Sequence, residues 1–397
     1  LLGACVALLV LLGVTLLAFQ DLASLMRNHK QVRYLINPLN TLYASGKLAS
    51  DRLSHVSRTL QPIGLDAHLG PTHTATRRTP LVVLVVGETA RAANFSLGGY
   101  GRNTNPTLSQ LAAQDPALTY YSMVHSCGTN TQASLPCMFS HLGRDAFEST
   151  RQPYENLLDV LQRAGLAVLW IDNQSGCKGL CDRVNHVDTF GQTTSGLCAN
   201  GECFDEVLLS GLDQRIAALD PQRLARGVVL VLHQMGSHGP AYFKRSPTAF
   251  KSFMPECTSN VLQDCPREQL INAYDNTIVY TDHVLTSLVR WLADKAAHGG
   301  QDTAMVYVSD HGESLGENNL YLHGLPYALA PDTQTHVPML SWLSPPIAQR
   351  LNLRIDCLRQ HAAGALSHDN LFHAVLGLAD VQTSLYRKDM DWFATCR

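Results

Sequence analysis

The unbroken apolar run Leu81-Val-Val-Leu-Val-Val86 is followed directly by Gly87-Glu88. A second apolar run, residues 303–308, is followed by Ser309-Asp310-His311. Unbroken Val- and Leu-rich runs of this length are typical of strands that are buried on both faces of a sheet. Each run therefore predicts a central strand, and each predicted strand ends beside side chains that can ligate a metal.

Further apolar runs alternate with helical patterns from residue 79 onward. The predicted strands are residues 81–86, 167–171, 227–232, 303–308 and 336–342. The predicted helices are residues 107–113, 154–164, 205–219, 268–297 and 368–378. This alternation predicts an α/β fold, in which a mostly parallel sheet is covered by helices on both faces.

Possible metal ligands gather where the predicted strands end. In parallel sheets, ligands bind beyond the carboxyl ends of the strands. The candidates at those ends are Glu88, His233, His238, Asp310 and His311. Zinc binds carboxylate oxygen and imidazole nitrogen, and it lowers the pKa of a hydroxyl in an open coordination position. We therefore expect a zinc site at Glu88 and the Asp310-His311 pair. The alternatives are a turn carboxylate and a structural Asp–His pair.

Three hydroxyl side chains lie between two cysteines in Cys127-Gly-Thr-Asn-Thr-Gln-Ala-Ser-Leu-Pro-Cys137. The segment predicts the start of a helix, where free backbone N–H groups favour an anionic phosphate. A hydroxyl beside a metal site suits a nucleophile for ester or phosphoryl transfer. Chemistry alone leaves Thr129, Thr131 and Ser134 open as that nucleophile, and a plain N-cap is the alternative for each.

Two histidines and one lysine extend the candidate site. His238 lies in the turn His-Gln-Met-Gly-Ser-His238-Gly-Pro, and His323 lies in Tyr-Leu-His323-Gly. Both suit phosphate contact, proton transfer or a second metal, and the alternative is a structural histidine. Lys178, in the short loop Cys-Lys-Gly-Leu-Cys, suits contact with a phosphate oxygen. A solvated surface lysine is the alternative.

The chain opens with an uncharged apolar run at residues 1–19, LLGACVALLVLLGVTLLAF. A helix of this length, at about 1.5 Å per residue, crosses a hydrocarbon core of about 30 Å. A signal peptide is the alternative, but the run lacks a basic start and a small-residue cleavage pattern. We predict a transmembrane helix at 1–19, the last of a truncated membrane domain. A juxtamembrane and linker segment at 20–79 and a catalytic domain at 80–397 are expected to follow.

The cysteines predict an oxidising compartment. Of 11 cysteines, Cys5 lies in the apolar run, and the remainder is an even number. The expected disulfides are Cys127–Cys137, Cys177–Cys181, Cys198–Cys203, Cys257–Cys265 and Cys357–Cys396. Zinc knuckles are the alternative, but the chain has no C-x2-C pattern. Arg27, Lys30 and Arg33 after the apolar run favour a cytoplasmic side instead. We predict the oxidising compartment that the cysteines indicate, because those basic residues also suit contact with anionic lipid headgroups.

Five long motifs occur in a fixed order along the chain. They are GETARAANFSLGGYGRNTNP from Gly87, CGTNTQASLPCMFS from Cys127, DNQSGCKGLCDRV from Asp172, HQMGSHGPAY from His233 and SDHGESLGENNLYLHG from Ser309. Together they closely resemble the phosphoethanolamine–lipid A transferases, which include the transferable colistin-resistance enzymes. The segment NHKQVRYLINP from Asn28 is similar to the part of that family just after its last membrane helix. The resemblance implies an alkaline-phosphatase-like catalytic domain in the periplasm.

The resemblance also implies a role for each candidate residue. It makes Thr131 the nucleophile. The implied zinc ligands are Glu88, Thr131, Asp310 and His311. The implied phosphoethanolamine-binding positions are Lys178, His238 and His323. The two histidines are also candidates for proton transfer and for a second zinc.

The expected reaction is zinc-dependent transfer of phosphoethanolamine from phosphatidylethanolamine to a phosphate of lipid A, through a phospho-threonine intermediate. Polymyxin and colistin resistance would follow from it. The expected partners are the donor lipid, lipid A and the membrane. A monomer is expected in the inner membrane of a Gram-negative bacterium, with its catalytic domain in the periplasm. The net charge of −3 gives no basic surface for nucleic acid.

Three alternatives differ from this expectation. One is a transferase with another acceptor, such as a core sugar or a glucan. Another is a phosphatase or sulfatase-like hydrolase. A formylglycine sulfatase needs C-x-P-x-R, and the one Cys-Pro of the chain, Cys265-Pro-Arg, has the wrong spacing. A third is a membrane-anchored binding module without activity, which would hold no zinc.

Overall fold

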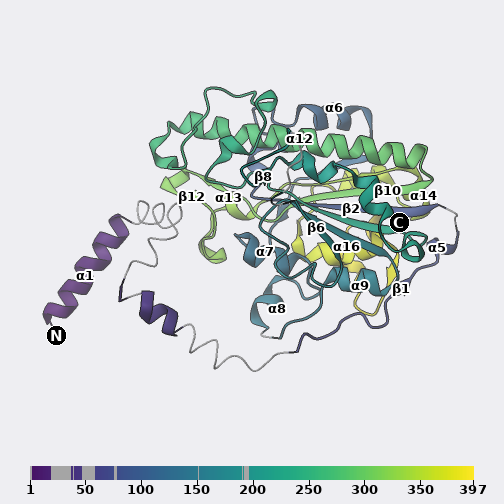
Figure 1. The fold of residues 1–397 in the computed structure, drawn as a ribbon, viewed down its shortest axis with the longest axis horizontal. Helices are drawn as coiled ribbons and strands as arrows, with labels where there is room; N and C mark the ends of the chain where they lie inside the picture. The colour runs from purple at the N-terminus through teal and green to yellow at the C-terminus, as the bar shows by residue number, and fades with distance from the viewer. Residues whose placement is uncertain are drawn as a thin grey trace.

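A seven-stranded mixed sheet lies at the centre of the molecule (Figure 1). The computed structural model describes residues 2–18, 37–38, 40–46, 59–75, 78–150, 152–189, 191 and 196–397. In sheet order, the strands are β3 (Leu118–Tyr121), β13 (Met339–Leu343), β10 (Gln301–Ser309), β2 (Thr79–Gly87), β9 (Val228–His233), β5 (Ala167–Asp172) and β6 (Asn185–Asp188). The five strands from β10 to β6 are parallel. The predicted α/β architecture is confirmed.

Beyond β10, β13 runs antiparallel to the five parallel strands, and the edge strand β3 runs antiparallel to β13, so β3 has the same direction as the five. The sequence predicts a strand at residues 336–342, and the structure begins β13 only at Met339. Pro338 has no backbone N–H to donate to a neighbouring strand, which accounts for the late start. Its carbonyl accepts a hydrogen bond from the backbone N–H of Ser309 instead.

Strand β2 shows why the apolar run is unbroken. Its even-numbered residues from 82 to 86 pack into one hydrophobic cluster, and its odd-numbered residues from 81 to 85 pack into the other. All are at most 1% exposed. Since side chains alternate between the two faces of a strand, a strand covered on both faces needs an apolar residue at every position.

Helices cover both faces of the sheet (Figure 1). The 31-residue α12 (Arg267–Ala297) and α6 (Pro106–Gln114) pack on one face. The helices α9 (Leu157–Arg163) and α16 (Leu371–Leu378) pack on the other face. These four confirm predicted helices, although α9 begins late because Asn156 forms a capping box with Asp159.

The prediction of a single helix at residues 205–219 is wrong. The structure has a 3₁₀ helix, η3 (Asp205–Leu209), and a separate α10 (Leu212–Ala217). Gly211 between them has a φ of 65°, in the left-handed region that breaks a right-handed helix. The apolar periodicity of the segment does not reveal this break.

The N-terminal run forms α1 (Leu2–Leu17), a helix of 16 residues whose large apolar side chains are mostly exposed. Within the described ranges, the structure has no helix with the length and apolar character needed to cross a bilayer. Arg27, Lys30 and Arg33 lie outside the described residues. Part of the segment predicted as a linker packs on the domain: Ile63 is buried, and β1 (His68–Leu69) pairs with β15 (Val381–Gln382).

The five predicted disulfides are present, and Cys5 is free. Two of them close loops at the carboxyl edge of the sheet. One joins Cys127 to Cys137 around the three candidate hydroxyls, and another joins Cys177 to Cys181 around Lys178. The cross-links therefore restrain two segments that carry candidate site residues.

Two buried histidines are expected to make the fold sensitive to acid. Burial lowers the pKa of His368 to about 3, helped by the nearby charge of His311, and lowers the pKa of His373 to about 4. An unfolded histidine has a pKa of about 6.5, so below that pH the unfolded chain binds more protons. Stability that is complete above about pH 6.5 is therefore lost as the pH falls, by up to about 1.4 kcal/mol per pH unit for each histidine.

Denaturant unfolding at a series of pH values checks this expectation. His373→Asn removes one of the two titrating groups, so its unfolding free energy should fall less steeply than that of the unchanged protein between about pH 6.5 and about pH 5. Equal slopes for the two proteins would contradict it.

Candidate active site

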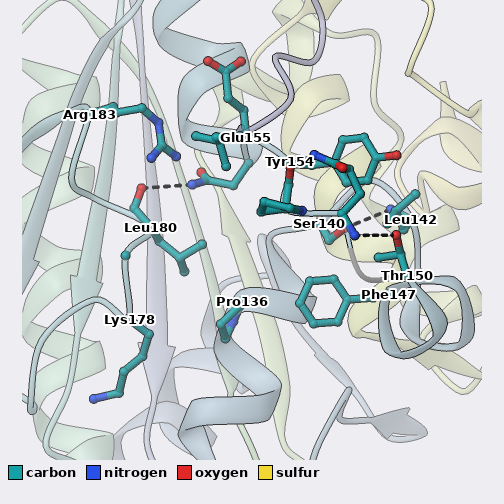
Figure 2. Close-up of a pocket in the computed structure, with 15 residues that line it drawn as sticks. Pro136, Ser140, Leu142, Phe147, Thr150, Tyr154, Glu155, Lys178, Leu180 and Arg183 are labelled. Carbon is teal, nitrogen blue, oxygen red and sulfur yellow. Dashed lines mark hydrogen bonds between the residues drawn. The ribbon is translucent and has the colours of Figure 1, made fainter. Parts of the chain in front are cut away.

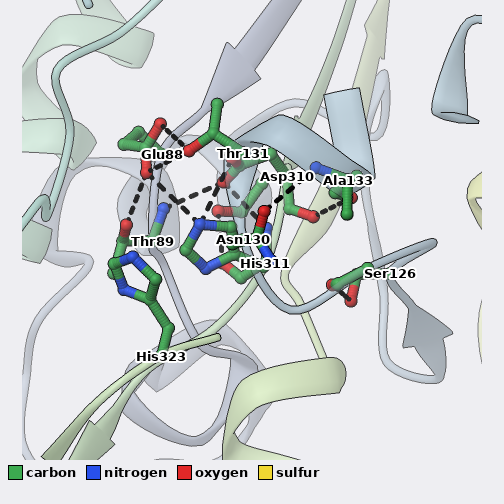
Figure 3. Close-up of polar contacts among 12 residues, drawn as sticks. Glu88, Thr89, Ser126, Asn130, Thr131, Ala133, Asp310, His311 and His323 are labelled. Atoms are coloured by element: carbon green, nitrogen blue, oxygen red, sulfur yellow. Dashed lines mark hydrogen bonds and ion pairs between the residues drawn. The ribbon is translucent and has the colours of Figure 1, made fainter. Parts of the chain in front are cut away.

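The carboxyl ends of β2 and β10 bring three ligand-type side chains together. The two strands are parallel neighbours in register, with Gly87 opposite Ser309. Glu88 and Asp310 therefore follow at the same level, and His311 comes next. All three side chains are fully buried. Figure 3 shows them pointing toward one another beneath the start of α7 (Thr131–Met138). The strand ends thus converge as the sequence predicts.

The distances within this cluster suit a shared cation. His311 Nε2 lies 3.4 Å from Glu88 Oε1 and 3.4 Å from Asp310 Oδ2. The ligand atoms of the three residues all lie within 4.8 Å of one another. Among the described residues, neither Asp310 Oδ2 nor His311 Nε2 has a hydrogen-bond partner. Buried polar atoms are normally paired, so two that face each other without a partner fit metal ligands.

The outer atoms of the same side chains are held firmly. Asp310 Oδ1 accepts hydrogen bonds from the backbone N–H groups of Thr89 at 3.0 Å and His311 at 2.8 Å. His311 Nδ1 lies 2.8 Å from the carbonyl oxygen of Gly312, to which it donates. That bond places a proton on Nδ1 and leaves Nε2 directed at the two carboxylates. Such outer contacts orient metal ligands, so the donor set fits zinc.

The buried carboxylates of the cluster favour a positive charge beside them. Burial and the charge of Glu88 raise the pKa of Asp310 to about 6. Burial would lower the pKa of His311, but the carboxylates of Asp310 and Glu88 raise it to about 10. Burial would likewise raise the pKa of Glu88, but the neighbouring histidines, His311 first, hold it below its usual range. A proton on His311 or a bound metal ion would supply this positive charge.

The three candidate hydroxyls have different partners. Thr131 begins α7, and its hydroxyl lies 3.1 Å and 3.2 Å from the two carboxylate oxygens of Glu88. The hydroxyl of Thr129 donates to the carbonyl oxygen of Leu325, and that of Ser134 donates to the carbonyl oxygen of Asp310. Thr131 is therefore the one of the three whose hydroxyl joins the carboxylate cluster (Figure 3).

The predicted histidines lie on the other side of the cluster. The His323 ring lies 4.3 Å from the His311 ring and 5.9 Å from the His238 ring, measured between centroids. His323 Nδ1 lies 3.2 Å from a carboxylate oxygen of Glu313, which orients the ring. Burial lowers the pKa of His238, which favours its neutral form. The three histidine rings therefore lie close together beside the carboxylate cluster.

Lys178 is the predicted residue that lies outside this cluster. Its Nζ donates to the backbone and side-chain oxygens of Ser175, at 2.9 Å and 2.6 Å. Lys178 and Pro136, the latter from α7, both line a cavity of about 420 Å³. Figure 2 shows the Lys178 side chain at the edge of this group of residues. Its backbone φ of 52° is in the left-handed region. The structure therefore brings Lys178 near the helix of Thr131, but its ammonium contacts Ser175.

Asp172 and Thr89 also support the site, although the sequence patterns do not single them out as they do His233. His233 Nδ1 lies 2.8 Å from Asp172 Oδ2, and its unpartnered Nε2 lies 3.9 Å from Glu88 Oε2. Thr89 donates to Glu88 Oε1 at 2.6 Å from a backbone with a φ of 59°. A β-branched residue rarely adopts that conformation, which is characteristic of a strained functional site. The position of Asp172 at the end of a predicted strand was the available signal.

Gly236 is expected to set the position of Glu88. A Cβ added there would lie 2.6 Å from the carbonyl oxygen of Glu88, at a φ of 51°. Gly236→Ala should therefore displace Glu88 and weaken zinc binding, and it should also lose about 1 kcal/mol for its left-handed backbone. Calorimetric zinc titration and denaturant unfolding measure the two effects.

Gly300→Ala is the matched control for this substitution. Gly300 has a φ of 66°, and an added Cβ would meet no atom within 4 Å. Its variant should lose similar stability and keep its zinc affinity. Equal zinc affinities for the two variants would contradict the steric argument.

Comparisons with known proteins agree with this geometry. Residues 80–381 match the family model described as Sulfatase, and residues 1–53 match the one described as Phosphoethanolamine transferase EptA/EptB. The chain is 45% identical over 395 residues to phosphoethanolamine transferase EptA of Escherichia coli K12, covering 99% of this chain and 70% of that protein. It is 42% identical over 351 residues to phosphatidylethanolamine transferase Mcr-1 of Escherichia coli, covering 86% of this chain and 63% of that protein.

A solved structure is similar over nearly the whole chain. The integral membrane protein lipooligosaccharide phosphoethanolamine transferase A (EptA) of Neisseria meningitidis matches with a TM-score of 0.83 at 41% identity, covering 99% of this chain and 72% of that chain. The catalytic core thus has the sulfatase-type fold, and the resemblance of the five motifs is confirmed. Identity at this level over nearly its full length shows that the chain belongs to the phosphoethanolamine transferase family of enzymes.

Proposed function

We propose that this enzyme transfers phosphoethanolamine from phosphatidylethanolamine to a phosphate of lipid A through a covalent intermediate on Thr131. The observation that carries the proposal is the Thr131 hydroxyl, 3.1 Å from Glu88 at the start of a helix. It joins a buried cluster in which Asp310 Oδ2 and His311 Nε2 have no hydrogen-bond partner among the described residues. A hydroxyl that begins a helix and lies beside residues suited to hold a metal ion is well placed for attack on a phosphate ester.

Glu88, Asp310, His311 and Thr131 would hold the zinc ion. When bound, zinc supplies positive charge that lowers the pKa of a hydroxyl and offsets charge on phosphoryl oxygens. The chain itself fixes the ligands before substrate arrives. Thr89 holds one oxygen of Glu88, and two backbone N–H groups hold one oxygen of Asp310. This order lowers the cost of reorganising the site during the reaction.

The reaction proceeds in two displacement steps. In the first, the Thr131 oxygen bonds to the phosphorus of phosphatidylethanolamine and the bond to the glycerol oxygen breaks. The proton of Thr131 ends on the hydroxyl of the released diacylglycerol. In the second, a phosphate oxygen of lipid A bonds to the phosphorus. The Thr131 oxygen leaves and regains a proton, and a diphosphate ester remains on the acceptor.

His238, His323 and Lys178 are proposed to serve the substrates. The lowered pKa of His238 leaves the ring free to accept a proton from a protonated acceptor phosphate. His323, held by Glu313, lies next to the His238 ring and suits contact with phosphoryl oxygens or a second zinc. Lys178 would have to exchange its contact with Ser175 for a phosphate oxygen.

The lipid substrates and the location are supported by the relatives and by the disulfides. Mcr-1 is named for phosphatidylethanolamine, and the Neisseria meningitidis protein is an integral membrane enzyme named for lipooligosaccharide. Five disulfides fit an oxidising compartment such as the periplasm. We propose inner-membrane attachment, polymyxin resistance as the consequence, and lipid A as the acceptor in preference to a core sugar or glucan.

Mass spectrometry of lipid A tests the acceptor. Cells that express the protein should carry lipid A heavier by one phosphoethanolamine group, and cells that express the Thr131→Ala variant should not. Diacylglycerol release is measured in the same cells. Diacylglycerol release with unmodified lipid A but a modified core sugar or glucan would show that the acceptor is that sugar or glucan and not lipid A. Release with no modified acceptor would favour a hydrolase.

A further inference from the structure

The segment Ser367-His368-Asp369-Asn370 lies beside residues 127–137, which carry Thr131 and are called the nucleophile segment below. Well over two hundred residues separate the two segments in the chain. Strand β14 (Leu366–Ser367) pairs in parallel with β4 (Val124–His125). The pairing carries the next residue, His368, toward Cys127 at the start of the hydroxyl-bearing segment. None of the roles proposed above uses His368.

The hydrogen bonds of His368 define its state. The backbone N–H of Cys127 donates to Nδ1 at 3.0 Å, so Nδ1 carries no proton. Nε2 lies 2.9 Å from the carbonyl oxygen of Ser309, so Nε2 carries the proton and donates it. The ring is 2% exposed. His368 is thus a neutral, buried bridge with both nitrogens in use.

The two partners belong to the two halves of the active site. Cys127 begins the segment that leads to Thr131, and Ser309 ends β10 just before Asp310 and His311. Ser134 adds a parallel link: its hydroxyl donates to the carbonyl oxygen of Asp310 and lies 3.3 Å from His368 Nδ1. The Cys127–Cys137 disulfide joins the two ends of the nucleophile segment to each other, and does not join that segment to the sheet.

We propose that His368 is a positioning residue, which fixes the distance between Thr131 and the Asp310–His311 pair by bridging Cys127 and Ser309. The inference rests on the proposed role of Thr131. His368 bonds to backbone groups on both sides, and within the described part of the chain no hydrogen bond of its ring goes to a proposed metal ligand. Misplacing a reacting group by about 1 Å costs about 100-fold in rate, so a single bridge can matter.

Two substitutions at His368 each remove one of its two hydrogen bonds and keep the other. The Oδ1 of an asparagine occupies the place of Nδ1, so His368→Asn keeps the bond from Cys127 and loses the bond to Ser309. The Nε2 of a glutamine occupies the place of the histidine Nε2, so His368→Gln does the reverse. Each variant should lower the rate constant of phosphoethanolamine adduct formation on Thr131 by about 10- to 100-fold. The KM for phosphatidylethanolamine and the zinc content should change little.

His373→Asn is the matched control. His373 is also 2% exposed, and its Nδ1 accepts from a backbone N–H, that of Arg387, at 3.2 Å. Its ring lies on α16, away from the nucleophile segment. All variants are compared at a temperature where denaturant curves show each to be folded. His373→Asn should lose stability but keep the rate constant of the unchanged enzyme.

The outcomes separate this inference from the proposed function. Adduct formation at the rate of His373→Asn in both His368 variants overturns the positioning role and leaves the role of Thr131 intact. An unchanged enzyme that forms no adduct on Thr131 overturns both. If neither His368 variant folds, Ser134→Ala tests the parallel link. Slower adduct formation in that variant supports positioning, and an unchanged rate overturns it.

Discussion

Thr131→Ala is expected to abolish both covalent modification of the enzyme and release of diacylglycerol. After incubation with phosphatidylethanolamine vesicles, the unchanged enzyme should carry an added mass of about 123 Da on the peptide from Cys127 to Cys137, because phosphoryl transfer to a hydroxyl leaves an ester. The variant lacks the oxygen that forms this ester. Peptide mass spectrometry detects the adduct, and lipid extraction measures diacylglycerol.

The neighbouring hydroxyls provide the controls. Thr129→Ala and Ser134→Ala should retain the adduct, because those hydroxyls donate to the carbonyl oxygens of Leu325 and Asp310. Thr131→Ser should keep part of the activity, since it loses a methyl group and keeps the oxygen. An adduct on Thr129 or Ser134, or normal turnover by Thr131→Ala, would show that the nucleophile is misassigned.

Asp310→Ala is expected to remove most of the zinc and nearly all activity. The substitution removes the unpartnered Oδ2 together with the oxygen held by Thr89 and His311. Loss of contacts outside the ligand shell weakens metal binding by about 10- to 100-fold, so loss of a ligand should exceed about 100-fold. Elemental analysis after dialysis measures the zinc, and denaturant unfolding tests whether the fold persists.

Asp302→Asn is the control at the opposite end of the same strand. Asp302 is 1% exposed and pairs with Arg78 and Arg350, the latter at 3.1 Å. Its replacement should destabilise the protein, because a broken buried ion pair leaves charge uncompensated. It should leave zinc bound. Full zinc occupancy in Asp310→Ala, or equal loss in both variants, would count against the proposed ligands.

Much of the fold follows from local patterns. The runs at 81–86 and 303–308 became central strands because each position must be apolar when both faces are covered. The residues after them had to meet, since parallel neighbours end at the same edge. Close spacing along the chain likewise predicted four of the disulfides, and Cys357–Cys396 was the pair left over. The helix predicted at 205–219 was wrong because one left-handed glycine, Gly211, interrupts an otherwise helical pattern.

The choice among the three hydroxyls shows where local patterns end. Thr129, Thr131 and Ser134 are all plausible at a helix start, and the family resemblance alone singled out Thr131 in the sequence. In the structure, the difference is one of direction. On α7 the Thr131 hydroxyl points toward Glu88 and the Ser134 hydroxyl toward a backbone carbonyl, and the Thr129 hydroxyl, just before α7, also points toward a backbone carbonyl. That direction depends on how α7 sits against the ends of β2 and β10.

The amino-acid sequence by itself determined five of the seven strands of the central sheet, the ligand types at their ends and the four local cysteine pairs, because each depends on residues close together in the chain. Tertiary structure alone decided the antiparallel direction of β13, the support of His233 by Asp172 and the bridge from Cys127 through His368 to Ser309. Those features join segments that are distant in sequence. Their hydrogen bonds form only when the sheet has set the register between them, and no local periodicity records it.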